Sequence, residues 1–123
     1  MNNNSNHSEN NLHPVYNLTY HNDLLDLKHR LSALSRFNEL VNYFNNLIKS
    51  LNIFIPEVKF DIETISHNNK NLFNIKIHFS PEKYKSYTNT ISSPDYLATI
   101  SKLFENSAKY IVDAHKKKLD LEY

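Results

Sequence analysis

The sequence predicts an α+β fold in which a long helix, an antiparallel β-hairpin and a second long helix follow one another. Apolar residues recur at steps of three or four in residues 22–52 and again in 94–118, and two stretches between them alternate apolar with polar residues. The length of 123 residues, with 40% hydrophobic and 22% charged side chains, suits one globular domain. We place this single α-β-β-α domain at residues 21–123.

Residues 1–20 are expected to form a disordered tail before that domain. Asn, Ser and His dominate them, as in Asn2-Asn3-Asn4-Ser5-Asn6. Such polar sequence buries too little apolar surface to offset the conformational entropy that ordering removes.

The first helix is expected to begin after Asn22, which can cap it, and to end at about Asn52. Asp23 and Asp26 would lie in its positive first turn, where acidic side chains are favourable. Neither Pro nor Gly interrupts the pattern. The buried face would consist of Leu24, Leu27, Leu31, Leu34, Phe37, Val41, Phe44, Ile48 and Leu51.

The hairpin is expected after Pro56, which stops the helix. Apolar and polar residues alternate over 58–63 and over 73–79, with a loop at 66–71 between them. Residues 53–55 are a candidate for a short third strand beside the hairpin. Because a two-stranded hairpin is only marginally stable in water, a helix, a further strand or a partner chain must cover it.

The second helix is expected to begin at Ser93-Pro94-Asp95, which provides a capping hydroxyl, a proline at the first helical position and an acid. The polar residues 80–92 before it would be irregular. The helix should reach about Lys118, because lysines suit the negative end of a helix dipole. Its buried face would consist of Leu97, Ile100, Leu103, Phe104, Ala108, Ile111 and Val112.

The composition excludes several kinds of chemistry. Without cysteine there is no disulfide scaffold, iron–sulfur cluster or cysteine nucleophile. Without glycine there is no phosphate-binding loop of the Walker or dinucleotide kind and no nucleophile elbow. Left-handed turn positions must therefore use asparagine, the residue that tolerates them next best.

No metal, no cofactor and no enzymatic activity is expected. The seven histidines include no pair at the helical spacing of metal ligands. Asp61 and Glu63 are paired carboxylates, but they alternate with apolar residues like ordinary solvated charges. Lys76 on the neighbouring strand is their natural cross-strand partner.

We expect a cytoplasmic protein with no membrane association. The longest uncharged apolar run is the short Ile53-Phe54-Ile55, far below the length of a membrane-spanning helix. The N-terminus also lacks the apolar stretch of a secretory signal.

Basic residues cluster locally although the formal net charge is only +1. Lys83, Tyr84, Lys85 and Tyr87 form one basic and aromatic cluster, which could stack on bases or could simply be half-buried tyrosines over the core. The last helix carries Lys102, Lys109, Lys116, Lys117 and Lys118. These lysines are either phosphate contacts or members of a solvated face with Glu105–Lys109 and Asp113–Lys117 pairs.

The order of elements, and two local motifs, resemble the YbaB/EbfC family of bacterial nucleoid-associated proteins. Residues 73–82, Phe-Asn-Ile-Lys-Ile-His-Phe-Ser-Pro-Glu, look like that family's strand running into an acidic segment. Residues 103–109, Leu-Phe-Glu-Asn-Ser-Ala-Lys, look like its helix motif. The basic stretch before Leu119 resembles the family's charged helix end.

The resemblance implies a homodimer that binds double-stranded DNA in the nucleoid with little sequence preference. Two copies would join through the sheet region, and their helices would project as arms that contact phosphates. The candidate contacts are Lys28, Arg30, Arg36, Lys109, Lys116, Lys117 and Lys118.

A protein-interaction module is the alternative function. A secretion chaperone, an immunity protein or a phage-encoded inhibitor would suit the near-zero net charge and the aromatic residues Tyr84, Tyr87 and Tyr96. A stoichiometric protein partner would distinguish this function from DNA binding.

Overall fold

The computed structural model describes residues 13–21 and 27–122, and the side chains among them at 13–21 and 34–119. The helices and strands run in the order β1 (Val15–Tyr20), α2 (Leu27–Ser50), β2 (Glu57–His67), β3 (Lys70–Phe79), β4 (Tyr87–Ser93) and α3 (Tyr96–Glu122). The starting residues predicted for the first helix, Asn22 to Asp26, lie outside the described part.

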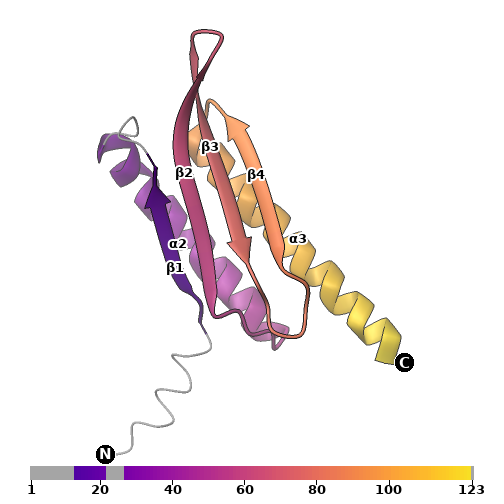
Figure 1. Ribbon diagram of the computed structural model, residues 1–123. Coiled ribbons are helices and arrows are strands. Elements are labelled where there is room, and N and C mark those ends of the chain that lie inside the picture. Colours follow the sequence, from indigo (N-terminus) through magenta and orange to yellow (C-terminus); the bar gives the residue numbers. More distant parts are fainter. Residues whose placement is uncertain (1–12, 22–26, 123) are drawn as a thin grey trace, which may run out of the picture.

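The strands form one four-stranded mixed sheet in the order β1-β2-β3-β4 (Figure 1). β1 pairs with β2 in parallel, whereas the β2–β3 and β3–β4 pairs are antiparallel. The predicted layout of helix, hairpin and helix is therefore wrong. The fold is α+β and contains the predicted β2–β3 hairpin and two long helices. It also contains a strand on each side of the hairpin that was not predicted.

The first additional strand, β1, lies within the residues that composition assigns to a tail. Its side chains alternate, so that Tyr16, Leu18 and Tyr20 pack against the core while Val15 and Asn17 are exposed. Backbone bonds from Val15 N to Pro56 O (3.0 Å) and from His21 N to Ile62 O (2.9 Å) hold both ends of the strand. This alternation of exposed and partly buried residues is the pattern of a strand, although asparagine-rich sequence precedes it.

The second additional strand, β4, occupies part of the stretch predicted to be irregular. Thr, Tyr and Ile favour strands, and a row of hydroxyl side chains makes its outer face polar without charge. Residues 53–55, the candidate for a short third strand, do not form a strand. Instead, Ile53 and Ile55 are buried in the core, and Phe54 O accepts a hydrogen bond from Glu82 N at 2.9 Å.

Asparagine ends helix α2 in the way that glycine usually does. Asn52 is left-handed, with a φ of 55°, and donates its N–H to Lys49 O. The next residue, Ile53, donates to Ile48 O, and both of these isoleucines are buried. This is a Schellman cap with its usual apolar contact. Asn68 and Asn69 likewise form the left-handed two-residue turn of the β2–β3 hairpin.

Helix α3 begins slightly later than predicted. Asp95, rather than Ser93, caps it, because the Asp95 carboxylate accepts the Ala98 N–H at 3.0 Å. The Ser93 hydroxyl instead accepts the Asp95 N–H at 3.2 Å.

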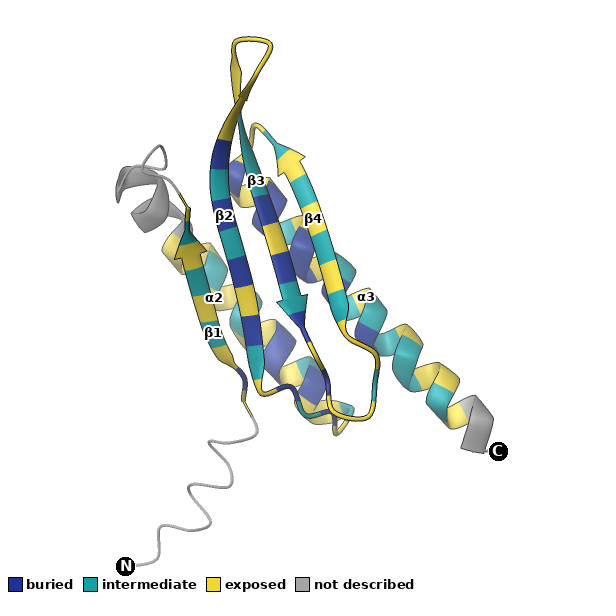
Figure 2. Ribbon diagram, viewed as in Figure 1, coloured by how far each residue is buried: buried dark blue, intermediate teal, exposed yellow. Residues whose placement is uncertain are grey.

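Both helices cover the same face of the sheet, and the opposite face is open (Figures 1 and 2). Phenylalanines from both helices and from β2 meet between the two layers in three edge-on contacts and one tilted contact, with ring centroids 5.5–6.1 Å apart. These residues are Phe37, Phe44, Phe60 and Phe104. Two strands and two helices of the same chain cover the hairpin, so it does not need a partner chain to cover it.

Candidate nucleic-acid interface

The β3–β4 connection lies beside the C-terminal part of α3, which projects past the edge of β4 (Figure 1). Between them is an open hollow of about 580 Å³, within the range of ligand pockets. We call this region the lysine–tyrosine corner. It is lined by Lys83, Tyr84, Lys85, Tyr110, Asp113, Ala114, Lys117 and Lys118.

The charge of the lysine–tyrosine corner is strongly positive for a nearly neutral protein. Four lysines line it, and Asp113 is the one acid among its lining residues. Lys83 and Lys85 come from the loop, whereas Lys117 and Lys118 come from the helix. The structure thus joins two features that the sequence presents separately, the basic–aromatic cluster and the lysine-rich helix end.

The loop of the corner is held in place at several points. Glu82 N donates to Phe54 O (2.9 Å), and the hydroxyls of Ser80 and Ser86 are 2.7 Å apart across the loop. The Tyr110 hydroxyl donates to Lys85 O, which ties the loop directly to α3. These bonds hold the loop lysines close to the helix lysines before any ligand arrives.

Lys83 has an unusual backbone conformation. Its φ of 72° lies in the left-handed region, where the other non-glycine residues of the described chain are asparagines. A lysine there is strained, because its Cβ approaches the following carbonyl. The surrounding hydrogen bonds maintain this conformation at the surface where the lysines gather.

Tyr110, which lines the corner, faces Tyr87, and both tyrosines pack against the core. Their rings stack with centroids 4.6 Å apart and an interplanar angle of 26°. Burial raises the pKa of Tyr87, with a further contribution from Tyr110, and burial also raises the pKa of Tyr110. Both hydroxyls therefore keep their protons at neutral pH, which suits the bond that Tyr110 donates.

Tyr84 presents its ring differently. It is half-buried, and the ammonium of Lys118 lies over it, 5.5 Å from the ring centroid. This is a cation–π contact near the surface, and such contacts are weak.

The structure divides the predicted DNA contacts among separate places. Lys117 and Lys118 line the lysine–tyrosine corner, and Lys116 is exposed on α3 outside it. Arg36 and Lys109 line a different hollow, the groove between α2 and α3. Lys28 and Arg30 belong to α2, but their side chains lie outside the described residues.

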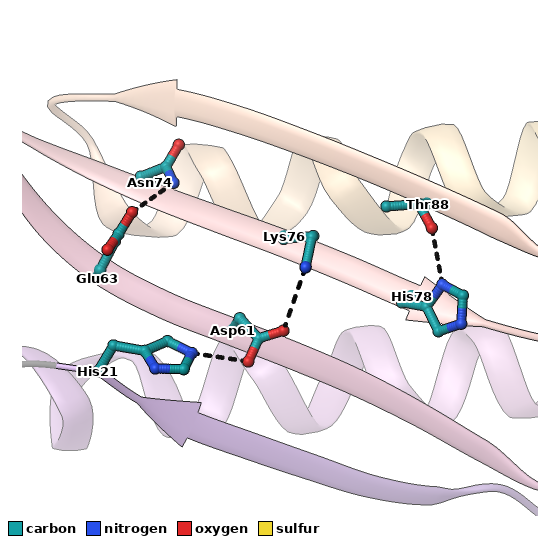
Figure 3. A network of polar contacts seen from close by, with 7 residues as sticks. All are labelled: His21, Asp61, Glu63, Asn74, Lys76, His78 and Thr88. Atoms are coloured by element: carbon teal, nitrogen blue, oxygen red, sulfur yellow. Dashed lines mark hydrogen bonds and ion pairs between the residues drawn. The ribbon is translucent and has the colours of Figure 1, made fainter.

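The open face of the sheet carries a network of polar side chains (Figure 3). Asp61 lies between His21 (2.7 Å) and Lys76 (3.8 Å), which confirms Lys76 as its cross-strand partner. Asn74 donates to Glu63 at 2.9 Å and accepts from Ser92 at 2.6 Å. The two carboxylates are thus partnered by their neighbours, and no group of three potential metal ligands was found among the described residues.

Three residues of the corner, Tyr110, Asp113 and Ala114, are absent from the contacts predicted from the sequence. Their positions in the sequence indicate them, because Asp113 and Ala114 lie three and four residues after Tyr110, and Lys117 follows at the same spacing. Residues three or four apart share one face of a helix. The same spacing predicts a Glu105–Lys109 pair, but Glu105 pairs with Lys102 at 3.3 Å.

No protein-family model and no curated protein matches the chain. Among solved structures, the Protein Y N-terminal domain of Thermus thermophilus is similar, with a TM-score of 0.45 and 11% sequence identity. The match covers 80% of this chain and 94% of that chain. So distant a likeness carries no argument about function. Over the part of the chain that the structure describes, no helix is long and apolar enough to cross a membrane.

Proposed function

We propose that this chain binds nucleic acid through the lysine–tyrosine corner. The observation that carries the proposal is the convergence of four lysines around one hollow, from two segments far apart in the sequence. Lysines arranged in this way neutralise backbone phosphates and release the counterions condensed on them. Since the net charge of the whole chain is only +1, the binding would depend on this local cluster.

The ordered loop supports the proposal. Nucleic acid brings phosphates at a regular spacing, so a protein that holds its cations in advance loses less entropy on binding than one with free lysines. The Tyr110–Lys85 bond and the Ser80–Ser86 contact provide that order here. Contacts of this kind position nucleic acid without reading its sequence.

The test is the affinity of a fluorescein-labelled oligonucleotide, measured by anisotropy between about 25 and 300 mM KCl. The affinity should fall with salt, with a logarithmic slope of roughly −3 if about four phosphates are neutralised. The triple variant Lys83→Ala, Lys117→Ala, Lys118→Ala should bind at least about tenfold more weakly, with a slope closer to zero.

A second triple variant serves as the matched control. Lys59→Ala, Lys76→Ala, Lys102→Ala removes the same number of charges from other surfaces, so only the position of the charges differs. It should keep its affinity within about threefold. Absence of binding at low salt with micromolar protein would overturn the proposal, and so would equal losses in the two triple variants.

A protein-interaction role is the second candidate, and the groove between α2 and α3 favours it. This groove has a volume of about 470 Å³ and an apolar floor that includes Leu40, Leu47 and Val112. Tyr43, also in the lining, is 62% exposed. A stoichiometric protein that co-purifies with the native chain and is lost from Tyr43→Ala would favour this candidate.

A further inference from the structure

We infer that the lysine–tyrosine corner takes single-stranded nucleic acid, with one unpaired base stacked on the ring of Tyr84. The inference rests on the proposed function and adds the class of ligand. The three tyrosines of this region differ in what covers their rings. The rings of Tyr87 and Tyr110 already face each other, whereas the ring of Tyr84 is covered by the Lys118 ammonium.

A nucleotide can displace the Lys118 ammonium from the ring of Tyr84. A base would replace it on the face of Tyr84, and the ammonium would move to a phosphate of the same nucleotide strand. Stacking of a base on an aromatic side chain typically strengthens binding by roughly five- to a hundredfold. The cation–π contact that is given up is a weak one at the surface. The exchange therefore favours the nucleotide.

The positions of the lysines suit the two phosphates that flank a stacked base. Lys83 and Lys85 are the sequence neighbours of Tyr84, and Lys117 and Lys118 approach from the helix. Cations thus line both the loop side and the helix side of the hollow that Tyr84 also lines.

Duplex nucleic acid does not fit this arrangement equally well. Its bases are stacked on one another and paired, so only its phosphates would reach the corner. A single strand can offer an unstacked base together with its phosphates. The hollow of about 580 Å³ provides room for such a base beside Tyr84.

The experiment compares four ligands at one low salt concentration. They are oligo(dT) and oligo(U) of about 12 nucleotides, a DNA duplex of the same length, and heparin as a polyanion without bases. Both single strands should bind more tightly than the duplex. A difference between oligo(dT) and oligo(U) would reflect the sugar together with the 5-methyl group of thymine.

Three variants separate stacking from charge. Tyr84→Leu should weaken single-strand binding about tenfold and leave duplex and heparin binding unchanged, because it removes the ring and no charge. Tyr84→Phe keeps the ring and should bind within about twofold of the unmodified chain. Tyr43→Leu, at an exposed tyrosine in the groove between α2 and α3, is the matched control and should have no effect. Circular dichroism verifies that each variant is folded.

A spectroscopic measurement reports stacking directly. An oligonucleotide with one 2-aminopurine should lose fluorescence on binding the unmodified chain, and lose less on binding Tyr84→Leu. The inference is overturned if Tyr84→Leu binds single strands normally, or if the duplex binds as tightly as the single strands. If no ligand binds at all, the proposed function itself fails, and the two failures are therefore distinguishable.

Discussion

Tyr16 is a partly buried tyrosine that ties β1 to α2. Its hydroxyl donates a hydrogen bond to Asn45 Oδ1 at 2.6 Å, and its ring meets Phe37 edge-on with centroids 6.3 Å apart. Burial raises the pKa of Tyr16 well above its ordinary value. The folded chain therefore holds this proton more tightly than the unfolded chain does.

The raised pKa of Tyr16 has a consequence for alkaline stability. Below a pH of about 10 both states hold the proton, and the stabilisation is fully present. Above about pH 10 the unfolded state releases the proton first, so the free energy of unfolding falls as the pH rises through the folded pKa. Tyr16→Phe should cost about 1 kcal/mol at neutral pH through the lost hydrogen bond, and should lose less stability above pH 10. Urea unfolding across this pH range measures both effects.

Tyr43→Phe is the control for this measurement, because Tyr43 is an exposed tyrosine of the same helix. It should leave the pH dependence unchanged. An unaltered alkaline slope in Tyr16→Phe would show that burial of this hydroxyl is not what couples folding to pH.

Asparagine is the second residue type that matters at this scale. Since the chain has no glycine, Asn52 ends a helix and Asn68 and Asn69 form a hairpin turn, all with positive φ. The prediction from composition is confirmed at these three positions, whereas Lys83 is a left-handed residue that is not an asparagine. Its basis is local, because the short polar side chain tolerates the left-handed region.

At the scale of elements, β1 is the clearest departure from expectation. Tyr16, Leu18 and Tyr20 alternate with exposed residues as in any half-buried strand, yet the asparagine-rich surroundings point to a tail. β1 becomes ordered because β2 offers it a parallel edge and the helices offer its inner face a core. Neither partner can be identified from residues 15–20 alone.

Two neighbouring substitutions in β1 test this account. Leu18→Ala removes a side chain that packs on the core and should destabilise the chain by roughly 1–2 kcal/mol, less than a fully buried leucine because Leu18 is only partly buried. Asn17→Ala, on the open face, should change stability by less than about 0.5 kcal/mol. Chemical denaturation measures both. Equal, negligible effects would be the behaviour of a tail and would contradict the strand.

At the scale of the whole molecule, the sheet and the two helices of one chain form the hydrophobic core between them. The hairpin has a strand on each side and two helices over one face, so the instability that suggested a partner is relieved internally. The homodimer that the resemblance implies is therefore not needed to cover the hairpin.

The independence of folding from association can be measured. The midpoint of thermal unfolding should stay constant over roughly a hundredfold range of protein concentration, because unfolding of a self-contained chain does not involve dissociation. A midpoint that rises with concentration would show that a second copy stabilises the fold. Tyr43→Ala in the groove between α2 and α3 would then show whether that apolar surface is the contact.

The local patterns of the sequence determine the two helices, the central hairpin and the turns. Helical steps of three or four, strand alternation and capping residues act between near neighbours, so their effects are visible in a short stretch of chain. The tertiary structure decides the pairing of β1 with β2, the addition of β4, and the meeting of Lys83 and Lys85 with the helix lysines. These depend on contacts between distant residues, whose formation follows from how the whole core packs and not from any one segment.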